Sequence, residues 1–355
     1  MKSLFKNRKV FLIAFIAMCT SACTMGSCRL ATILFYGYDP GYWVDIWGYN
    51  VWIGEGGSAT GLSFYTGPFG SAFPLQFLSG QPAVSIRSFY SDRYRLSNGI
   101  YVETDSAVSF FDGRNPALKS TIPVRGGLQT FQVAPDGRWL YTTSRTSTAL
   151  YAVDLLNKAV GYQVDFGPGT RPTGIAITPD SSRVFVTDPA KNSIYSVDPN
   201  SQTFRTILDP GIQPGLPGIT PDGQNLFVPN FASNDVFVLD IMTETPVTTM
   251  TGVPSPTEVS FNPMGTLGFV INSPSGANGS LWTFDPGSFM SLGTTPLGSR
   301  PQSIAWSPGG TFMHIATAGD GFIRTVDSTA KPPKLVANTR VGINPVGVAT
   351  VRLKF

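Results

Sequence analysis

RPTGIAITPDSSRVFVTDPAKNSIYSVD, residues 171–198, contains three short apolar runs separated by turn-forming residues. β-Branched and aromatic residues fill the runs, whereas Pro, Asp and Asn lie between them, which is typical of short strands joined by tight turns. Proline presets the backbone angle φ, and Asp and Asn side chains bond to the backbone that follows. We therefore expect strands at 172–178, 183–187 and 192–198, with a fourth at 203–208.

The same plan recurs along the chain with a period of roughly 42–45 residues. In each copy a second proline follows the first by seven residues, and in three of the four copies an aspartate follows nineteen residues later. The proline pairs are Pro172 and Pro179, Pro214 and Pro221, Pro256 and Pro263, and Pro301 and Pro308. A period of this length, built of short strands, indicates the blades of a β-propeller. It predicts the fold but no function, because propellers host many unrelated activities.

The repeats predict an all-β, seven-bladed β-propeller closed by pairing of its N- and C-terminal strands. Five copies occupy 125–167, 168–210, 211–252, 253–298 and 299–341, and a sixth with a degenerate first strand lies near 82–124. Residues 344–351 match the first strand of a further copy, and its other three strands are found at 49–54, 62–65 and 74–78. Pairing these segments would remove the open edge of a linear stack. Six or eight blades remain alternatives.

The first residues form a targeting segment. Four basic residues precede the apolar run 10–18, which is too short to span a bilayer as a mature helix. The small residues before Cys23 resemble a bacterial lipobox, although its first position is Thr20 where Leu is usual. We expect a signal peptide at 1–22, acylation of Cys23, a lipidated, aromatic-rich extension at 23–48 and the propeller at 49–355. Cys28 is the alternative acylation site, and an ordinary secretory signal cut near Ala22 is the other possibility.

Removal of the signal changes the charge balance. The mature chain keeps 25 − 4 = 21 Lys and Arg against 22 Asp and Glu. No basic stripe remains, so we expect no nucleic-acid partner. With Cys19 removed and Cys23 acylated, Cys28 has no intramolecular partner and no disulfide framework is expected.

The strand Val184–Asp188 resembles the tetrapeptide that names the YVTN β-propeller repeats. ITPDGQNLFVPNFASNDVFVLD (219–240) and VAPDGRWLYTTSRTSTALYAVD (133–154) are similar, and the resemblance covers roughly residues 82–351. Relatives of this repeat include surface-layer proteins, bacterial exported proteins and lactonase-like propellers. The matching residues form turns and core, so the resemblance implies a seven-bladed ring and no particular chemistry. Residues 304–327 are also similar, more weakly, to the repeats of periplasmic TolB-type propellers.

Catalytic signatures are missing from the sequence. His314 is the only histidine, which excludes a multi-histidine metal centre, and no Gly-x-Ser-x-Gly elbow is present. The acids recur blade after blade as turn formers do, although calcium bound by their oxygens remains possible. They are Asp136, Asp180 and Asp222 in the first turns, and Asp112, Asp154, Asp198, Asp240, Asp285 and Asp327 at the ends of the third runs.

The mouth of the ring is the expected place for a ligand. If the first strand of each blade is innermost, the residue before the first proline of each copy lines one rim of the central channel. These candidate contacts are Gln81, Arg171, Gln213, Ser255, Arg300 and Asn344. Arg171 and Arg300 could hold a carboxylate or phosphate through two hydrogen bonds, or could equally cap loops.

These observations predict a lipid-anchored, non-catalytic binding or scaffold protein of the bacterial envelope, without a catalytic residue, cofactor or metal. It would face the periplasm or the cell surface, with the outer membrane favoured by Thr24 after the acylated cysteine. Its partners would be the membrane, through the lipid, and a protein or small molecule. The alternative is a lactonase-like hydrolase with an oxygen-ligated metal in the central channel. A third possibility is an accessory factor that docks a partner through the aromatic segment 35–47.

Overall fold

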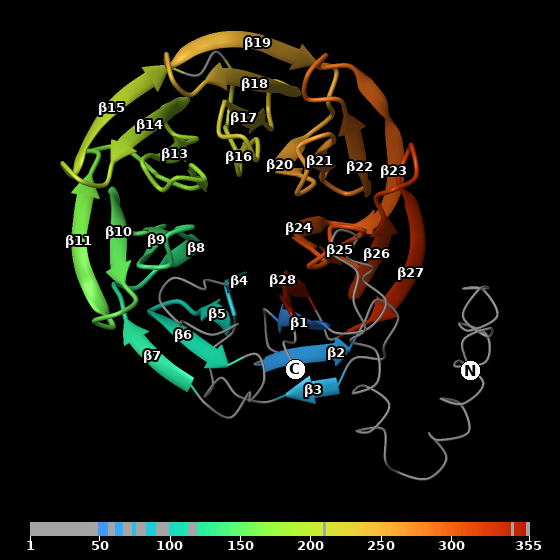
Figure 1. Cartoon of the computed structure of the whole chain (residues 1–355), viewed down its shortest axis with the longest axis horizontal. Coiled ribbons are helices and arrows are strands. Elements are labelled where there is room, and N and C mark those ends of the chain that lie inside the picture. The colour runs from blue at the N-terminus through green and yellow to red at the C-terminus, as the bar shows by residue number, and fades with distance from the viewer. Residues whose placement is uncertain are drawn as a thin grey trace, which may run out of the picture.

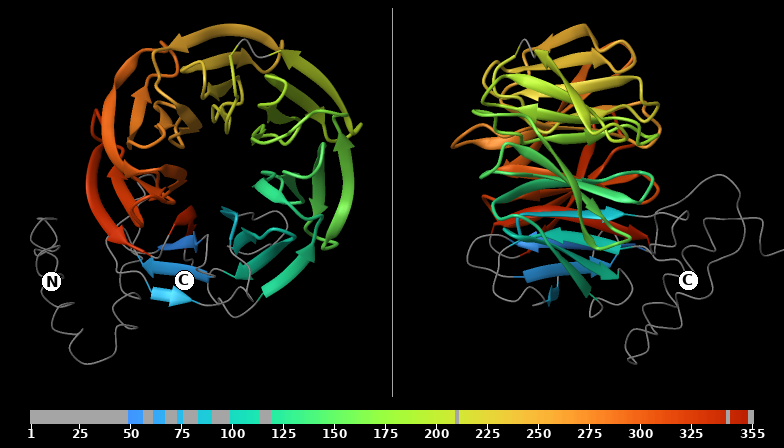
Figure 2. Two further views of the ribbon diagram at one scale, coloured as in Figure 1. Left: turned by 180° about the vertical axis from the view of Figure 1, so that it is seen from behind. Right: turned by 90° about the vertical axis from the view of Figure 1, so that its left-hand side faces the viewer.

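The computed structural model describes residues 49–55, 61–66, 73–75, 83–89, 99–112, 119–208, 211–341 and 344–352. Antiparallel four-stranded sheets stand around a ring, with one strand of each sheet innermost (Figures 1 and 2). The all-β propeller that the sequence predicts is confirmed. Among the described residues no helix has the length and hydropathy needed to cross a membrane. The predicted signal peptide, Cys23 and the extension to residue 48 lie outside the described residues.

Six sheets are each built from four strands that are consecutive in the sequence. Three of them contain β4 (Ser85–Phe89), β5 (Gly99–Glu103), β6 (Ala107–Asp112) and β7 (Lys119–Pro123); β8 (Leu128–Val133), β9 (Trp139–Ser144), β10 (Ala149–Asp154) and β11 (Ala159–Asp165); and β12 (Ile175–Ile177), β13 (Val184–Asp188), β14 (Ser193–Asp198) and β15 (Thr203–Leu208). The other three contain β16 (Gly218–Ile219), β17 (Asn225–Asn230), β18 (Asp235–Asp240) and β19 (Thr245–Thr251); β20 (Pro256–Phe261), β21 (Gly268–Asn272), β22 (Asn278–Phe284) and β23 (Ser291–Ser299); and β24 (Pro301–Trp306), β25 (Phe312–Thr317), β26 (Phe322–Asp327) and β27 (Lys334–Arg340).

One further sheet joins the two ends of the described chain. Its order is β28-β1-β2-β3, where β28 is Pro345–Arg352, β1 is Tyr49–Glu55, β2 is Gly61–Thr66 and β3 is Phe73–Leu75. β28 and β1 run antiparallel, with Ile53 opposite Val348. The described parts of the four segments that the sequence singled out, at 49–54, 62–65, 74–78 and 344–351, therefore contribute strands to one sheet, and residues 76–78 lie outside the described residues.

Each second strand places its residues in fixed roles. Pairing to the first strand aligns the aromatic position of these strands, because Gln132 lies opposite Tyr141, Ala176 opposite Phe185 and Ser260 opposite Phe269. The side chains at this position pack between neighbouring sheets and are fully buried. The last position is polar and turns inward: Asp188 is buried and accepts hydrogen bonds from the Tyr195 hydroxyl (2.9 Å) and the Ala190 N–H (2.8 Å). The repeated tetrapeptide is thus a core residue followed, three positions later, by a turn-holding polar residue.

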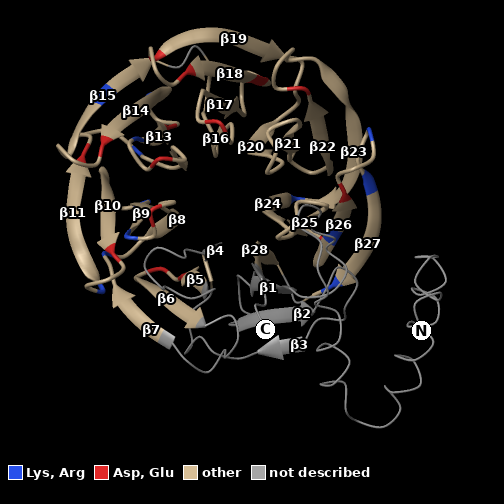
Figure 3. Ribbon diagram, in the orientation of Figure 1, with Lys and Arg blue, Asp and Glu red and all other residues tan. Residues whose placement is uncertain are grey.

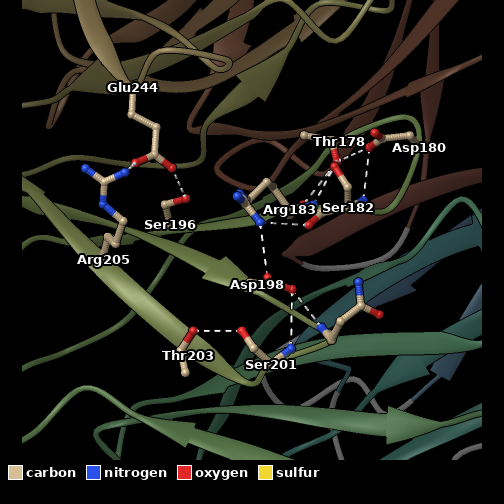
Figure 4. Close-up of polar contacts among 11 residues, drawn as sticks. Thr178, Asp180, Ser182, Arg183, Ser196, Asp198, Ser201, Thr203, Arg205 and Glu244 are labelled. Carbon is tan, nitrogen blue, oxygen red and sulfur yellow. Dashed lines mark hydrogen bonds and ion pairs between the residues drawn. The ribbon is translucent and has the colours of Figure 1, made fainter.

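The apolar core lies between sheets. Tyr141 and Leu150 of one sheet pack in the same cluster as Val186 and Tyr195 of the next. A polar contact also crosses a sheet boundary: Glu244, in the turn before β19, accepts a hydrogen bond from the Ser196 hydroxyl at 2.6 Å and pairs with Arg205 at 2.8 Å (Figure 4). Burying a large apolar side chain stabilises a fold by about 1.5–3 kcal/mol, so each sheet depends on its two neighbours.

β28 takes part in two such boundaries. Val348 packs with Ala316 and Ile323 of the sheet that precedes it in the ring, and Ala349 packs with Ile86 and Ile100 of the sheet that follows. Both side chains on β28 are almost completely buried.

Candidate functional site

The repeated aspartates are held in turns. Asp198, at the end of β14, accepts hydrogen bonds from the Asn200 N–H at 2.8 Å and the Ser201 N–H at 3.4 Å, and Arg183 pairs with its other oxygen at 3.5 Å (Figure 4). Asp180 accepts from the Thr178 hydroxyl and the Ser182 N–H. The same short bond to a backbone N–H two or three residues on is made by Asp136, Asp154, Asp222, Asp240, Asp285 and Asp327. The side chain of Asp112 lies outside the described part.

In three of the turns these bonds favour the ionised form of the carboxyl. Hydrogen bonds to the ionised form lower the pKa of a carboxyl. The Thr178 hydroxyl lowers the pKa of Asp180, and backbone N–H groups lower the pKa of Asp198 and Asp240. Figure 3 shows the acidic residues distributed around the ring rather than gathered at one place. Among the described residues, no three His, Cys, Asp or Glu side chains come together as a metal site would require.

A cavity of about 380 Å³ lies in the central channel. The innermost strands line it, from β8 on one side to Ile304 of β24 on the other. Successive side chains of a strand point to opposite faces, and alternate positions of two strands give the cavity its polar lining. These are Thr130 and Gln132 of β8 and Glu258 and Ser260 of β20.

Glu258 is the acidic residue of this lining. Its side chain is 8% exposed, at the channel surface beside Leu216. The backbone around it is tied to the preceding sheet, because the Leu216 N–H donates to the Thr257 carbonyl at 2.9 Å and the Val259 N–H donates to the Leu216 carbonyl at 3.1 Å. A neighbouring lining residue is also fixed, since the Trp306 indole N–H donates to the Ser260 hydroxyl at 2.9 Å. The lining is therefore preorganised.

Glycine permits the inner strands to approach one another on this side of the channel. A Cβ on Gly174 would meet the Gly215 carbonyl oxygen at 2.4 Å, and a Cβ on Gly215 would meet the Thr257 carbonyl oxygen at 2.6 Å. The first contact joins the β12 sheet to the β16 sheet and the second joins the β16 sheet to the β20 sheet. The channel wall is continuous here because these positions lack side chains.

His314 lies away from the cavity. It occupies the aromatic position of β25, opposite Ala305 of β24, and is completely buried. Its Nδ1 lies 3.1 Å from the Thr325 hydroxyl. Burial lowers the pKa of His314 to about 3, so the ring is neutral at physiological pH. The residue fills a core position that Tyr141, Phe185, Phe227 and Phe269 fill in other sheets.

The predicted rim residues share an unusual backbone. Gln213, Ser255, Arg300 and Asn344 all have a left-handed φ, between 47° and 60°. Carbonyls of three of them accept a backbone hydrogen bond from the residue after the second strand, as Ser255 does from the Ser273 N–H. Arg171 lacks this conformation, and the equivalent donor position in its sheet is Pro189, which has no N–H.

The structure places these residues at the N-terminal ends of the inner strands. Arg171, Gln213 and Arg300 are exposed, whereas Ser255 and Asn344 are half-buried. The channel cavity is lined by residues that lie further along four of the five segments, and none of the five residues lines it. Gln81 lies outside the described residues. That these residues contact a ligand stays a prediction.

Solved structures share this fold. A periplasmic gluconolactonase from Pseudomonas aeruginosa is similar with a TM-score of 0.67 and 16% identity, over 86% of this chain and 99% of that chain. A Bacteroides uniformis protein named for 6-phosphogluconolactonase activity gives a TM-score of 0.69 and 16% identity, over 86% and 99%. A hydrazine synthase from Kuenenia stuttgartiensis gives 0.65 and 19%, over 75% and 89%. The likeness is one of fold.

No protein-family model matches the sequence, the YVTN repeat family included, and no curated protein matches it. At these identities an unrelated function on the same fold is common. The site must therefore be interpreted from its own residues.

Sequence reasoning missed the channel lining. Thr130, Gln132, Glu258 and Ser260 do not recur from repeat to repeat, so the periodic pattern conceals them. One signal was present: Glu258 is an acidic residue inside a first run, where the clearest repeat has only apolar and small residues in Gly174–Ile177.

Proposed function

We propose that this protein is a non-catalytic binding module of the bacterial envelope that holds a small polar ligand in its central channel. The observation that carries the proposal is the division of its polar residues into two sets. The repeated carboxylates are engaged in turns, whereas the channel lining is polar, preorganised and different on each inner strand. Ligand sites commonly fix the orientation of a ligand through a few placed polar groups in a concave surface.

The ligand chemistry follows from the lining. Glu258 supplies a carboxylate, Gln132 an amide and Thr130 and Ser260 hydroxyls, with apolar surface from Ile175, Ile177 and Ile304. Carboxylate and amide oxygens accept hydrogen bonds from hydroxyl and ammonium groups. We expect a ligand with several hydroxyls or a cationic amine.

The experiment is a calorimetric titration of the purified mature protein with a panel of neutral sugars, polyols and amines. Glu258→Gln keeps the shape of the lining and removes its charge. We expect this variant to bind the best ligand with an affinity lower by about tenfold or more, because a charge-assisted hydrogen bond is lost. Asp327→Asn, in a turn, is the matched control and should leave affinity unchanged. Equal affinity of the wild type and Glu258→Gln for every ligand, or no binding at all, would refute the channel site.

We further propose that acylation at Cys23 tethers the module, with outer-membrane placement. A cysteine that carries about three acyl chains is held firmly, since each buried CH₂ contributes about 0.8 kcal/mol. Support comes from the N-terminal sequence alone. Metabolic labelling with a fatty-acid analogue should mark the wild type and Cys28→Ser but not Cys23→Ser, and labelling of Cys23→Ser would exclude this anchor.

We also infer that the sheet of β28 with β1–β3 is the seventh blade and that it closes the ring. Its support is the pairing of β28 with β1 and the burial of Val348 and Ala349 against the sheets on either side.

A lactonase-like hydrolase is the second candidate, favoured by the names of two similar structures. In that case the channel would bind a lactone, and the possible metal ligands would be limited to oxygen donors such as Glu258. Turnover in a lactone and ester screen that is lost in Glu258→Gln would favour the enzyme over the binding module.

A further inference from the structure

A second cavity, of about 370 Å³, lies at the edge of the sheet β8–β11 and is separate from the channel cavity. It is formed where the loop between β9 and β10 meets the segment before β8 and the end of β11. None of its lining residues lines the channel cavity. The side chains used below are Arg125, Arg145, Thr146, Ser147, Gln163 and Asp165.

Two arginines mark this cavity as a departure from the repeat. Leu128 lies opposite Ser144, as Pro256 lies opposite Asn272 and Pro301 opposite Thr317, which aligns the sheets residue by residue. Three positions before the aligned residue, this sheet has Arg125. The four other sheets in which this position is described have Gly169, Gly211, Val253 and Gly298.

The second arginine departs in the same way. Arg145 follows Ser144, and its N–H donates to the Gly127 carbonyl at 2.7 Å, as the Ala318 N–H donates to the Arg300 carbonyl. The aligned residues in the same four sheets are Pro189, Phe231, Ser273 and Ala318. The backbone hydrogen bonding at Arg145 therefore matches that of another sheet, while both positions carry arginine side chains that the four aligned sheets lack.

In two other sheets the glycine at the position of Arg125 leaves no room for a side chain. A Cβ on Gly211 would meet the Asn230 side chain at 2.0 Å, and one on Gly298 would meet the Asp320 side chain at 2.0 Å. In the β8–β11 sheet the aligned strand-end residue is Ser144, whose small hydroxyl instead donates to the Gly126 carbonyl at 2.9 Å. Arg125 is exposed at the cavity as a result.

The guanidinium groups are available to an anion. Arg145 pairs with Asp105 at 3.3 Å, but both side chains are more than half exposed, at 53% and 55%, and such a pair contributes little. No ion pair of Arg125 is found among the described residues. Guanidinium groups hold carboxylate and phosphate through paired hydrogen bonds.

The rest of the lining suits hydroxyl groups. Asp165 is fixed by the Thr148 hydroxyl at 2.6 Å and the Gly167 N–H at 3.0 Å, both to the same oxygen, Oδ1. Its other oxygen and the Gln163 amide can accept hydrogen bonds from a ligand, while the hydroxyls of Thr146 and Ser147 can donate or accept. An oxyanion site thus lies beside a set of groups that recognise hydroxyls.

We propose that this cavity binds an acidic carbohydrate, a sugar that carries a carboxylate or a phosphate. Arg125 and Arg145 hold the oxyanion, and Asp165 and Gln163 accept from the sugar hydroxyls. The site acts independently of the channel.

The test is a calorimetric titration of the full mature chain with glucuronate, glucose 6-phosphate, glucose and inorganic phosphate. At least one charged sugar binds, more weakly as ionic strength rises, and the preferred one identifies the oxyanion. Arg125→Gly and Arg145→Ala, which install the residues of other sheets, each weaken that binding about tenfold or more and leave the melting temperature unchanged. Arg340→Gln, on the outer strand β27, and Glu258→Gln, in the channel, leave it unaltered.

The proposal is overturned if neither charged sugar binds, if glucose binds as tightly as both, or if inorganic phosphate alone matches glucose 6-phosphate. Undiminished binding by both arginine variants, or equal loss in Arg340→Gln, overturns it as well.

Discussion

At the scale of single residues, each position of the repeat has a structural role, and different side chains can occupy the same position. His314 is the clearest case, since it occupies a core position where four other sheets have Tyr or Phe. A neutral imidazole fits there, with Thr325 as a hydrogen-bond partner, but a charged one does not. The only histidine of the sequence is thus a structural residue with an acid-sensitive side chain.

We expect His314 to make the free energy of unfolding sensitive to acid. Burial lowers its folded-state pKa to about 3, below the unfolded value of about 6.5. Below pH ~6.5 the imidazole of His314 is protonated in the unfolded chain but stays neutral in the folded chain. The free energy of unfolding therefore decreases progressively as the pH falls toward 3. We expect His314→Phe to lose less stability than the wild type between pH 7 and pH 4. Urea unfolding at the two pH values measures this, and parallel losses in the two proteins would contradict it.

At the scale of elements, the inner strands are held together by the absence of side chains as much as by their presence. Gly174 and Gly215 let three neighbouring inner strands touch, and the carbonyl oxygens lie where a methyl group would otherwise stand. The polar lining of the channel depends on this contact, because Glu258 lies on the last of the three strands.

A methyl group at Gly174 should disturb both stability and the channel. The added Cβ would lie 2.4 Å from a backbone oxygen and 2.6 Å from the Thr187 hydroxyl, and overpacking of this kind costs about 1–3 kcal/mol. We expect Gly174→Ala to lower the free energy of unfolding by that amount. Gly126→Ala is the control, because its nearest neighbour would be 3.6 Å away. Equal unfolding free energies for the two variants would argue against the close approach.

The sequence predicts the bounds of some strands better than those of others. The second and third strands of 125–341 follow from period-2 runs between Pro, Asp and Gly, and β13 and β14 match the expected segments closely. One first strand is shorter than predicted: the run 172–178 contains only Ile175–Ile177 as β12, because Thr178 and Asp180 form the turn. The channel lining depends on which side chains of the inner strands meet around the cavity, and these residues do not recur from repeat to repeat.

The rim residues were only partly predictable from the sequence. The residues before the opening prolines precede an inner strand in the sequence, and the structure places the described ones at its start. The left-handed backbone of four of them does not follow from the sequence, because a residue before proline is usually extended. The two arginines of the second cavity stand out only when the sheets are aligned by hydrogen bonds, because Arg125 lies in a segment without a proline pair.

At the scale of the whole molecule, each sheet depends on its neighbours, and one sheet depends on both ends of the described chain. Val348 and Ala349 of β28 are buried against opposite neighbours. Loss of their contacts would open two boundaries at once. A ring with an exposed inner strand would also present unpaired backbone groups.

A small change on β28 tests this dependence without deleting it. Val348→Ala removes two methyl groups from a completely buried site, which should cost about 2 kcal/mol from transfer and cavity terms. Val336→Ala on the outer strand β27, where the side chain is 38% exposed, should cost much less. Urea unfolding of the two variants gives the comparison. Removal of residues 345–355 should then broaden the transition and lower its midpoint, and an unchanged transition would rule out closure by β28.

The pairing of β28 with β1 also sets an order of events during synthesis. β28 emerges from the ribosome after every other described strand, at a rate of about 5–20 residues per second. Until then β1 has no inner partner, although the sheets between can already stack on one another. If the sheet of β28 with β1–β3 closes the ring, as proposed, the closed ring can form only after β28 has been synthesised, and a product that ends before β28 would leave one edge of β1 unpaired.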